Sequence, residues 1–230
     1  MNNKNKNVCF FHIATMGHYE HVNSEMLYTM LNCGFLDQLE KLYICKLGVN
    51  PLNLPFNHKC FEIIDCGIDL KQYEYPTLKK LKEFANNTKE NYNILYLCNA
   101  GVGHPPGTTQ YFYPGWRRLM LHFVVVKWQE CLETLEEYDA CGIEWEPTPI
   151  GHFSGNFWWV TSKFAKTLLE VDDAIVYQKN NIGYSDRHAA EFWLGMNKEI
   201  KTKSIYHTPY NWRTRPIIDW YQKVIGDFKI

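Results

Sequence analysis

A polar turn beside three large aromatic rings is the stretch of this sequence best suited to hold a ligand. It reads His152-Phe153-Ser154-Gly155-Asn156-Phe157-Trp158-Trp159. Small Ser154 and Gly155 let the backbone approach a ligand closely, and Asn156 offers an amide donor and acceptor. The rings present flat apolar faces of the kind that pack against sugars. The same pattern is typical of core residues at the start of a helix, so a pocket wall and a packing role both stay open.

Three common motif classes are absent from the sequence. The run from Gly101 to Gly107 carries glycines, but Pro105 and Pro106 prevent it from opening a phosphate-binding helix, which excludes a Rossmann fingerprint and a P-loop. The sequence has no Gly-x-Ser-x-Gly nucleophile turn and no His-Glu-x-x-His pair. Hydrolase functions that depend on these motifs therefore lose support.

Composition narrows the class of protein further. The chain has 230 residues, of which 46% are hydrophobic and 16% aromatic, and it shows no repeat or low-complexity tract. We expect a single globular domain over residues 1–230 with an enzyme-like interior. With 24 Lys and Arg against 25 Asp and Glu, the net charge of -1 lacks the basic excess of a protein that binds duplex nucleic acid.

The cysteines and the lengths of the apolar runs indicate the cellular compartment in which we expect the protein. None of the eight cysteines forms a Cys-x-x-Cys pair, and several lie in apolar runs where thiols act as small hydrophobes. The first seven residues are polar, and no apolar run approaches the 18 residues of a membrane span. We therefore expect a protein without a membrane span in a reducing compartment, the cytoplasm, or the host cytoplasm if the source is viral.

Alternating strand and helix patterns predict an α/β fold. Short apolar runs without clean alternation are typical of strands buried on both faces, and apolar residues at three- and four-residue spacing indicate helices. The predicted strands are 8–14, 41–47, 61–66 and 93–98, and the predicted helices between them are 21–36 and 76–85. This order predicts a mostly parallel central sheet flanked by helices.

The second half of the chain continues the pattern. Apolar residues from Trp116 to Leu135 repeat at helical spacing, which predicts one long helix over 116–138. We then expect a strand at 140–143, helices at 159–169 and 185–194, and a last strand at 203–207. Open α/β sheets bind ligands beyond the carboxyl ends of their strands, so the site should lie beyond Ala14, Cys66 and Cys98.

Several segments together resemble a family of small GT-A-type glycosyltransferases. They are Ile94 to Val102, Trp116 to Met120, Tyr138 to Gly142 and, as the most specific, His152 to Trp159. Members occur in bacterial polysaccharide clusters and large DNA viruses, including a chlorella-virus glycosyltransferase domain. The family reads Leu-Tyr-Leu-His-Thr-Lys-Gly where this chain has Leu-Tyr-Leu-Cys-Asn-Ala-Gly, so the roles of that His and Lys are not carried over.

The resemblance implies a GT-A-like domain that transfers a hexosyl or deoxyhexosyl group from a nucleotide diphosphate sugar to a glycan or glycoprotein. Among the possible donors, a UDP-sugar is the one that we expect first. The loops after the first and third strands should hold the base and ribose, with Asp65 as an acceptor unless it is an ordinary turn residue. Arg117 or Arg118 could meet the diphosphate or lie on the solvent face. The candidate donor-binding residues are His12, Ala14, Thr15, Asp65, Asn99, Gly101, Arg117, Ser154, Gly155 and Asn156.

Mn²⁺ or Mg²⁺ is the cofactor that the resemblance implies, although the usual Asp-x-Asp is missing. Asn99, Ala100 and Gly101 stand at the expected strand end, and a neutral amide is a poor sole ligand for either ion. Glu144 with Glu146, and Asp172 with Asp173, are alternative carboxylate sources, the second pair in a segment typical of solvated surface. His207 is the candidate metal or diphosphate ligand, with a structural histidine as the alternative.

A later helix carries the catalytic base in inverting members of the wider GT-A group. Here that implies Glu191, whose apolar neighbours Phe192 and Trp193 would suit a base that takes the proton of an acceptor hydroxyl. A surface ion pair is the alternative role for Glu191. Asp186 is the second candidate base, although capping of the helix is its other expected duty.

Two other functions stay open at this stage. The altered Cys98-Asn99-Ala100-Gly101 segment fits a catalytically inactive module that binds a nucleotide sugar or carbohydrate. An S-adenosylmethionine or other nucleotide-cofactor enzyme on the same sheet is less favoured, because no glycine-rich loop follows Ala14.

Overall fold

The protein is described by a computed structural model that covers residues 5–103, 112–181 and 186–207. Its strands are β1 (Lys6–Ala14), β2 (Lys41–Leu47), β3 (Phe61–Asp65), β4 (Tyr92–Cys98), β5 (Ala140–Ile143), β6 (Trp145–Glu146), β7 (His152–Phe153), β8 (Trp158–Thr161) and β9 (Thr202–Tyr206). Its α-helices are α1 (Tyr19–Asn32), α2 (Tyr75–Asn87), α3 (Phe112–Leu121), α4 (Trp128–Thr134), α5 (Ser162–Ala165), α6 (Val171–Asn181) and α7 (Asp186–Phe192). Short 3-10 helices lie at Phe35–Gln38 and Leu70–Gln72, and a π-helical turn at His122–Val126.

Seven of the described strands form one mixed sheet in the order β3-β2-β1-β4-β8-β5-β9. β8 runs antiparallel to both of its neighbours, β4 and β5, and the remaining pairs are parallel. This is the α/β fold with a mostly parallel central sheet that the sequence predicts. β6 and β7 form a separate antiparallel pair.

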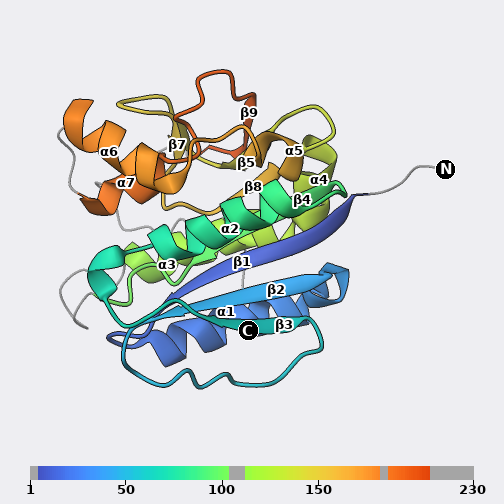
Figure 1. Cartoon of the computed structure of the whole chain (residues 1–230). Helices are drawn as coiled ribbons and strands as arrows, with labels where there is room; N and C mark the ends of the chain where they lie inside the picture. Colours follow the sequence, from blue (N-terminus) through green and yellow to red (C-terminus); the bar gives the residue numbers. More distant parts are fainter. Residues whose placement is uncertain (1–4, 104–111, 182–185, 208–230) are drawn as a thin grey trace.

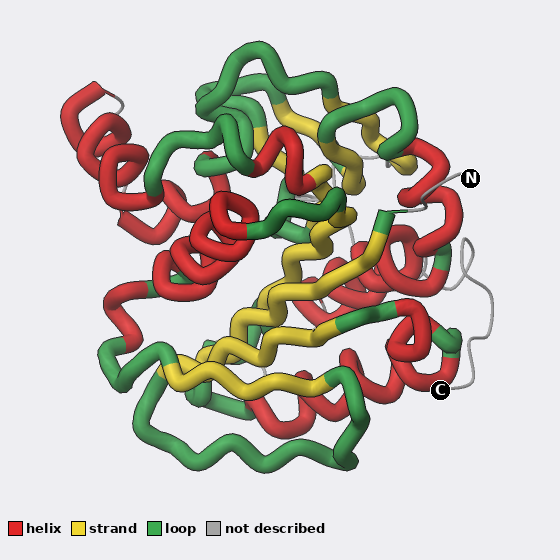
Figure 2. The backbone as a smooth tube through the Cα atoms, turned by 45° about the vertical axis from the view of Figure 1, so that its right-hand side comes forward, coloured by secondary structure: helices red, strands yellow, loops and turns green. Residues whose placement is uncertain are grey.

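Helices cover both faces of the sheet, as Figures 1 and 2 show. The odd-numbered residues of β1, such as Cys9 and Phe11, pack with α1, α3 and the segment before α4. The even-numbered residues Val8 and Phe10 pack with α2, α5, α6 and α7. Because β1 is covered on both faces, every side chain from Val8 to Ile13 is buried, which explains its continuous apolar sequence.

The long helix predicted over 116–138 is interrupted. α3 ends at Leu121, a π-helical turn spans His122–Val126, and α4 begins at Trp128. The amide of Lys127 donates to His122 O at 3.0 Å, the five-residue spacing of that turn. Three consecutive β-branched residues, Val124 to Val126, crowd an α-helical turn, which is a physical reason for the break.

The start of the helix predicted over 159–169 is wrong, because Trp158 to Thr161 form strand β8. Trp158, Trp159 and Val160 are at most 1% exposed, and β8 fills the place between β4 and β5. A short apolar run does not distinguish a strand from a buried helix by periodicity. The helix begins later as α5, where Thr161 Oγ1 accepts from Phe164 N.

Three further differences concern the second half of the chain. The acidic segment with Asp172 and Asp173 opens helix α6, which the sequence reading did not predict. His152 and Phe153 of the aromatic block form strand β7 rather than a turn. The helix predicted at 185–194 corresponds to α7, which is shorter and spans Asp186–Phe192.

The structure also bears on the cysteines and on the question of a membrane-spanning helix. None of the eight cysteines, all of which lie in the described ranges, forms a disulfide. Among the helices of the described ranges, none has both the length and the apolar character needed to cross a membrane.

Candidate functional site

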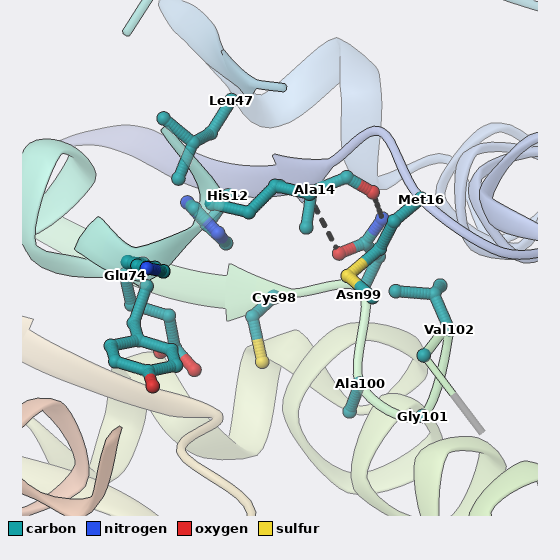
Figure 3. Close-up of a pocket in the computed structure, with 14 residues that line it drawn as sticks. His12, Ala14, Met16, Leu47, Glu74, Cys98, Asn99, Ala100, Gly101 and Val102 are labelled. Carbon is teal, nitrogen blue, oxygen red and sulfur yellow. Dashed lines mark hydrogen bonds between the residues drawn. The ribbon is translucent and has the colours of Figure 1, made fainter. Parts of the chain in front are cut away.

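A pocket of about 380 Å³ lies where the strand order of the sheet reverses. The chain proceeds from β1 outward to β2 and β3, and then returns to place β4 on the other side of β1. The pocket is lined by the carboxyl ends of β1, β2 and β4, which is where open α/β sheets bind ligands. Its described lining residues, drawn as sticks in Figure 3, are His12, Ala14, Met16, Leu47, Leu70, Lys71, Tyr73, Glu74, Cys98, Asn99, Ala100, Gly101, Val102 and Gly103.

The pocket lies in part where the sequence predicts the site. Ala14 and Cys98 line the pocket as expected, whereas Cys66 does not and Leu47 of β2 does. Loops that follow β1 and β4 pack directly on each other at this edge. A side chain at Gly17 would meet Val102 O at 1.8 Å, so only glycine permits that approach.

Asn99 ties the ends of β1 and β4 together. Its Oδ1 accepts from Ala14 N at 3.1 Å, and its Nδ2 donates to Ala14 O at 3.0 Å (Figure 3). The same Nδ2 donates to Asn23 Oδ1 at 3.3 Å. The amide group of Asn99 is therefore used within the protein, where it holds the ends of β1 and β4 together.

His12 lies at the base of the pocket and is 3% exposed. Its Nδ1 lies 2.8 Å from Thr77 Oγ1 of α2. Burial lowers the pKa of His12 to about 4, so the imidazole is neutral at pH 7. It can offer a ligand a hydrogen bond but no positive charge.

Glu74, immediately before α2, supplies the one carboxylate among the described residues that line the pocket. Its Oε2 accepts from Tyr96 Oη at 2.6 Å and from Asn156 Nδ2 at 2.5 Å. Burial, followed by the negative charge of Glu74, raises the pKa of Tyr96 well above its ordinary value, so the phenol keeps its proton and donates it.

The aromatic block completes this network from the other side. Trp158 Nε1 donates to Asn156 Oδ1 at 2.6 Å, and the Trp158 ring stacks on Tyr96 with centroids 4.9 Å apart. Asn156 takes a left-handed conformation, with φ 60°, that asparagine tolerates better than most residues. The block thus reaches the pocket through Glu74. We call the four residues Glu74, Tyr96, Asn156 and Trp158 the Glu74 network.

Sequence reasoning missed Glu74. Its signal was present, since Glu74 lies in the loop between a predicted strand that ends near Cys66 and a predicted helix that begins at Pro76. That connection must run along the carboxyl edge of the sheet, and an acidic residue there is a candidate for the site.

Arg117 does not face the pocket as a free cation. Its guanidinium donates to Glu25 Oε2 at 2.7 Å and to Ala100 O at 2.9 Å, and the residue is 2% exposed. Arg118 contacts the other oxygen of Glu25. Burial raises the pKa of Glu25, but the two guanidinium groups outweigh burial and hold it below its ordinary value. Arg117 therefore holds the loop after β4 in place through its hydrogen bond to Ala100 O.

Two other candidate donor-binding residues also lie outside the lining. Thr15 is 1% exposed, and its hydroxyl and its amide both donate to Leu47 O. Asp65 is exposed and accepts from Gly67 N at 2.9 Å, in the manner of a turn residue. These contacts match the turn role that the sequence left open for Asp65.

The Ser154-Gly155-Asn156 turn is packed into the protein. Ser154 and Asn156 are 4% and 2% exposed, and a side chain at Gly155 would meet Trp116 Nε1 at 2.5 Å. None of the three is among the described lining residues of the pocket, and Asn156 donates to one of those residues, Glu74. The rings of Phe157, Trp158 and Trp159 are buried, which matches the packing role that the sequence left open for them.

The proposed catalytic and metal residues lie on other elements. Glu191 belongs to α7, which packs against α6 and β7, and the side chain of Asp186 lies outside the described residues. His207 follows β9 and is exposed, with its Nδ1 3.9 Å from Glu144 Oε2. The structure thus brings together His207 and one of the alternative carboxylates predicted from the sequence.

The described residues do not fit a Mn²⁺ or Mg²⁺ site. Both ions prefer several oxygen ligands, yet the end of β4 offers Asn99, whose amide is bonded to Ala14 and Asn23. Within the described ranges, no group of three His, Cys, Asp or Glu side chains is arranged to hold a metal ion.

A family profile described as a domain of unknown function, DUF8361, matches residues 35–181. The chain belongs to the DUF8361 family. The matched range holds every member of the Glu74 network and excludes His12. No curated protein matches this DUF8361 chain.

Among solved structures, the DUF8361 chain is similar to the crystal structure of 4-diphosphocytidyl-2C-methyl-D-erythritolsynthase from Anaerococcus prevotii DSM 20548. The identity is 10% and the TM-score 0.41, with 96% of this chain and 99% of that chain covered. At this level of likeness, function has to be argued from the pocket.

Proposed function

We propose that this protein is a glycosyltransferase that uses a nucleotide diphosphate sugar. One observation carries the proposal. Asn156, from the block that most resembles GT-A-type glycosyltransferases, donates to Glu74, a lining residue of the pocket at the switch point of the sheet. The most specific part of the resemblance is therefore attached to the place where this fold class binds ligands.

The pocket suits the uncharged part of such a donor. Its walls combine apolar Met16, Leu47 and Leu70 with a few polar groups, the usual composition of a small-molecule site. Among the described lining residues Lys71 is the one cationic side chain, and we expect it to meet the diphosphate together with backbone amides. Gly101 and Gly103 let that backbone approach closely.

The proposed reaction is a displacement at the anomeric carbon. An acceptor hydroxyl oxygen attacks that carbon, its proton passes to a carboxylate, and the bond from the carbon to the diphosphate oxygen breaks. Glu191 stays our proposed base, by the GT-A resemblance. General-base help of this kind contributes roughly 10² to 10⁴ in rate.

The test uses the purified full chain. We expect isothermal titration calorimetry to detect binding of at least one of UDP-glucose, GDP-mannose and dTDP-rhamnose, and we expect slow hydrolysis of the same donor, assayed with and without Mn²⁺. We expect Glu191→Gln to lower hydrolysis at least tenfold while binding is kept. Binding of none of these donors would contradict the proposal.

A catalytically inactive binding module is the second candidate. Asn99 and Arg117, two of the candidate donor-binding residues, are engaged within the protein with Ala14 and Glu25. In that case a donor would bind, hydrolysis would stay at the buffer rate, and Glu191→Gln would change neither measurement.

A further inference from the structure

Two cysteines lie next to each other near the carboxyl ends of β2 and β3, the outer strands of the sheet (Figure 1). β2 pairs with β3 in parallel, with Cys45 opposite Ile64 and Lys46 opposite Asp65. Cys66 follows directly, and its amide donates to Lys46 O at 2.8 Å. Because side chains alternate along a strand, Cys45, Ile64 and Cys66 share one face of the sheet, the face that α2 covers.

The two thiols form a hydrogen bond with each other but differ in exposure. Cys45 is 0% exposed, whereas Cys66 is partly exposed. The hydrogen bond from Cys45, helped by the charge of Lys80, lowers the pKa of Cys66 against the opposing effects of burial and of Asp65. The same hydrogen bond, together with burial, raises the pKa of Cys45. Solvent therefore reaches the thiol that ionises more readily, and the buried thiol beside it keeps its proton.

We propose that Cys66 and Cys45 form a peroxide-sensitive modification site, in which Cys66 is oxidised first and Cys45 then closes a disulfide with it. This inference goes beyond the proposed function and does not depend on it. Cysteines that sense peroxides are reached by solvent, ionise readily and lie next to a second thiol. Cys66 has all three properties because the register of β2 and β3 places it beside Cys45.

The reaction consumes one molecule of hydrogen peroxide and forms one disulfide. The thiolate of Cys66 attacks one peroxide oxygen, the O–O bond breaks, and a sulfenic acid and a hydroxide form; the hydroxide takes up a proton and becomes water. Sγ of Cys45 then attacks Sγ of Cys66, the proton of Cys45 passes to the departing oxygen, and a second water leaves. The two thiols lose two electrons and two protons, and the peroxide is reduced to two waters.

Formation of the S–S bond, about 2 Å long, requires the two sulfurs to approach more closely than in a hydrogen bond. Cys66 lies just after β3, which ends at Asp65. The approach therefore moves the start of a loop, and the pairing of β2 with Phe61 to Asp65 stays in place.

Other cysteines of the chain provide internal comparisons. Cys131 and Cys141 form a second pair of hydrogen-bonded thiols, but both are 0% exposed, so we expect peroxide to oxidise them more slowly. Cys33 is partly exposed like Cys66, yet burial raises its pKa, and its thiol donates to Met30 O. These cysteines separate the effects of exposure and of a neighbouring thiol.

The experiment treats the folded full chain with hydrogen peroxide and maps its cysteines by mass spectrometry. Digestion with trypsin and an Asp-specific protease places Cys45, Cys60 and Cys66 in separate peptides. We expect a linked pair of peptides that contains Cys45 and Cys66 and that dithiothreitol separates. In the reduced chain, iodoacetamide should label Cys66 roughly tenfold or more faster than Cys33.

Three variants test the role of each thiol. Cys45→Ala should stop the reaction at the sulfenic acid of Cys66, so that dimedone labels Cys66 much more than in the wild type. Cys66→Ser should give neither the linked peptides nor the dimedone adduct at this site. Cys33→Ser is the matched control and should form the disulfide as the wild type does. Circular dichroism melts report whether each variant is folded, and the partly exposed Cys66→Ser keeps the test valid if the buried change destabilises the chain.

Several outcomes would overturn the inference. They are a disulfide that joins other cysteines in place of Cys45 and Cys66, earlier oxidation of Cys131 and Cys141, and labelling of Cys66 no faster than that of Cys33. Equal dimedone labelling of wild type and Cys45→Ala would overturn the role of Cys45. Donor binding tests the proposed function separately, and its absence would leave this modification site in place.

Discussion

At the residue scale, polar side chains near the pocket divide into those that hold the fold and those that face the ligand space. Asn99 donates a hydrogen bond to Ala14 O. Arg117 donates to the carboxylate of Glu25 and to Ala100 O. Buried polar groups need such partners, because an unpaired one costs about 1–3 kcal/mol. Glu74 and His12 are also anchored from within the protein, but both line the pocket.

The buried imidazole of His12 should make stability depend on pH. Its pKa is about 4 in the folded protein and near the ordinary 6.5 in the unfolded chain, so the unfolded chain binds the extra proton first. The contribution of neutral His12 to the free energy of unfolding is fully present above pH 6.5. It is lost as the pH falls toward 4, and the total loss is about 3 kcal/mol. Urea unfolding of wild type and His12→Gln between pH 7 and 4 measures the difference.

His12→Gln should show a shallower loss of unfolding free energy than the wild type over that pH range. Thr77→Val is the control, since it removes the partner of Nδ1 but leaves the imidazole buried, and it should keep the wild-type pH dependence. Parallel pH profiles for wild type and His12→Gln would show that His12 does not carry the effect.

At the element scale, the aromatic block is a strand, a tight turn and a second strand rather than the start of a helix. β7 ends at Phe153, the turn passes through Gly155 with φ 83°, and β8 begins at Trp158. The turn lies against α3, where Trp116 and Met120 leave no space for a side chain at Gly155. That contact fixes the turn and, through Asn156, the position of Glu74.

Gly155→Ala should therefore destabilise the protein by about 3 kcal/mol, from backbone strain and from overpacking together. Gly34→Ala is the matched control, because Gly34 has φ 74° but a side chain there would meet nothing within 4 Å. The control should lose only about 1 kcal/mol through strain. Urea denaturation of both variants gives the comparison, and equal losses would show that the contact with α3 adds nothing.

At the scale of the whole molecule, one sheet joins the two halves of the chain. β4 pairs with β1 on one side and with β8 on the other, and one buried cluster extends from Cys9 to Trp159. Such a shared core favours unfolding as one cooperative unit.

We expect a single urea transition that two probes report alike. All eight tryptophans follow residue 115, so their fluorescence reports on the second half, whereas far-UV circular dichroism reports on both halves. Leu42→Ala, a buried change in β2, should lower both midpoints together, with a loss of about 2–5 kcal/mol. Midpoints that separate, or a fluorescence curve that Leu42→Ala leaves unmoved, would show that the halves unfold independently.

The sequence by itself determined the alternation of strands and helices in the first half of the chain. β2 was predicted with its observed bounds of Lys41 to Leu47, and β4 and α2 were predicted to within one or two residues. These elements are set by local patterns, such as continuous apolar runs and a helix that opens at proline, which neighbouring residues carry together. The carboxyl edge as the place of the pocket follows from the same alternation.

Only the tertiary structure decided which polar residues meet. Asn156 and Glu74 are 82 positions apart, and Arg117 and Glu25 are 92 apart, so no local pattern pairs them. The conformation of Trp158 to Thr161 was decided in the same way, since an apolar run becomes a strand when two strand edges need a partner. Local sequence sets what a segment can form, whereas the packing of distant segments sets which form buries its apolar surface and satisfies its hydrogen bonds.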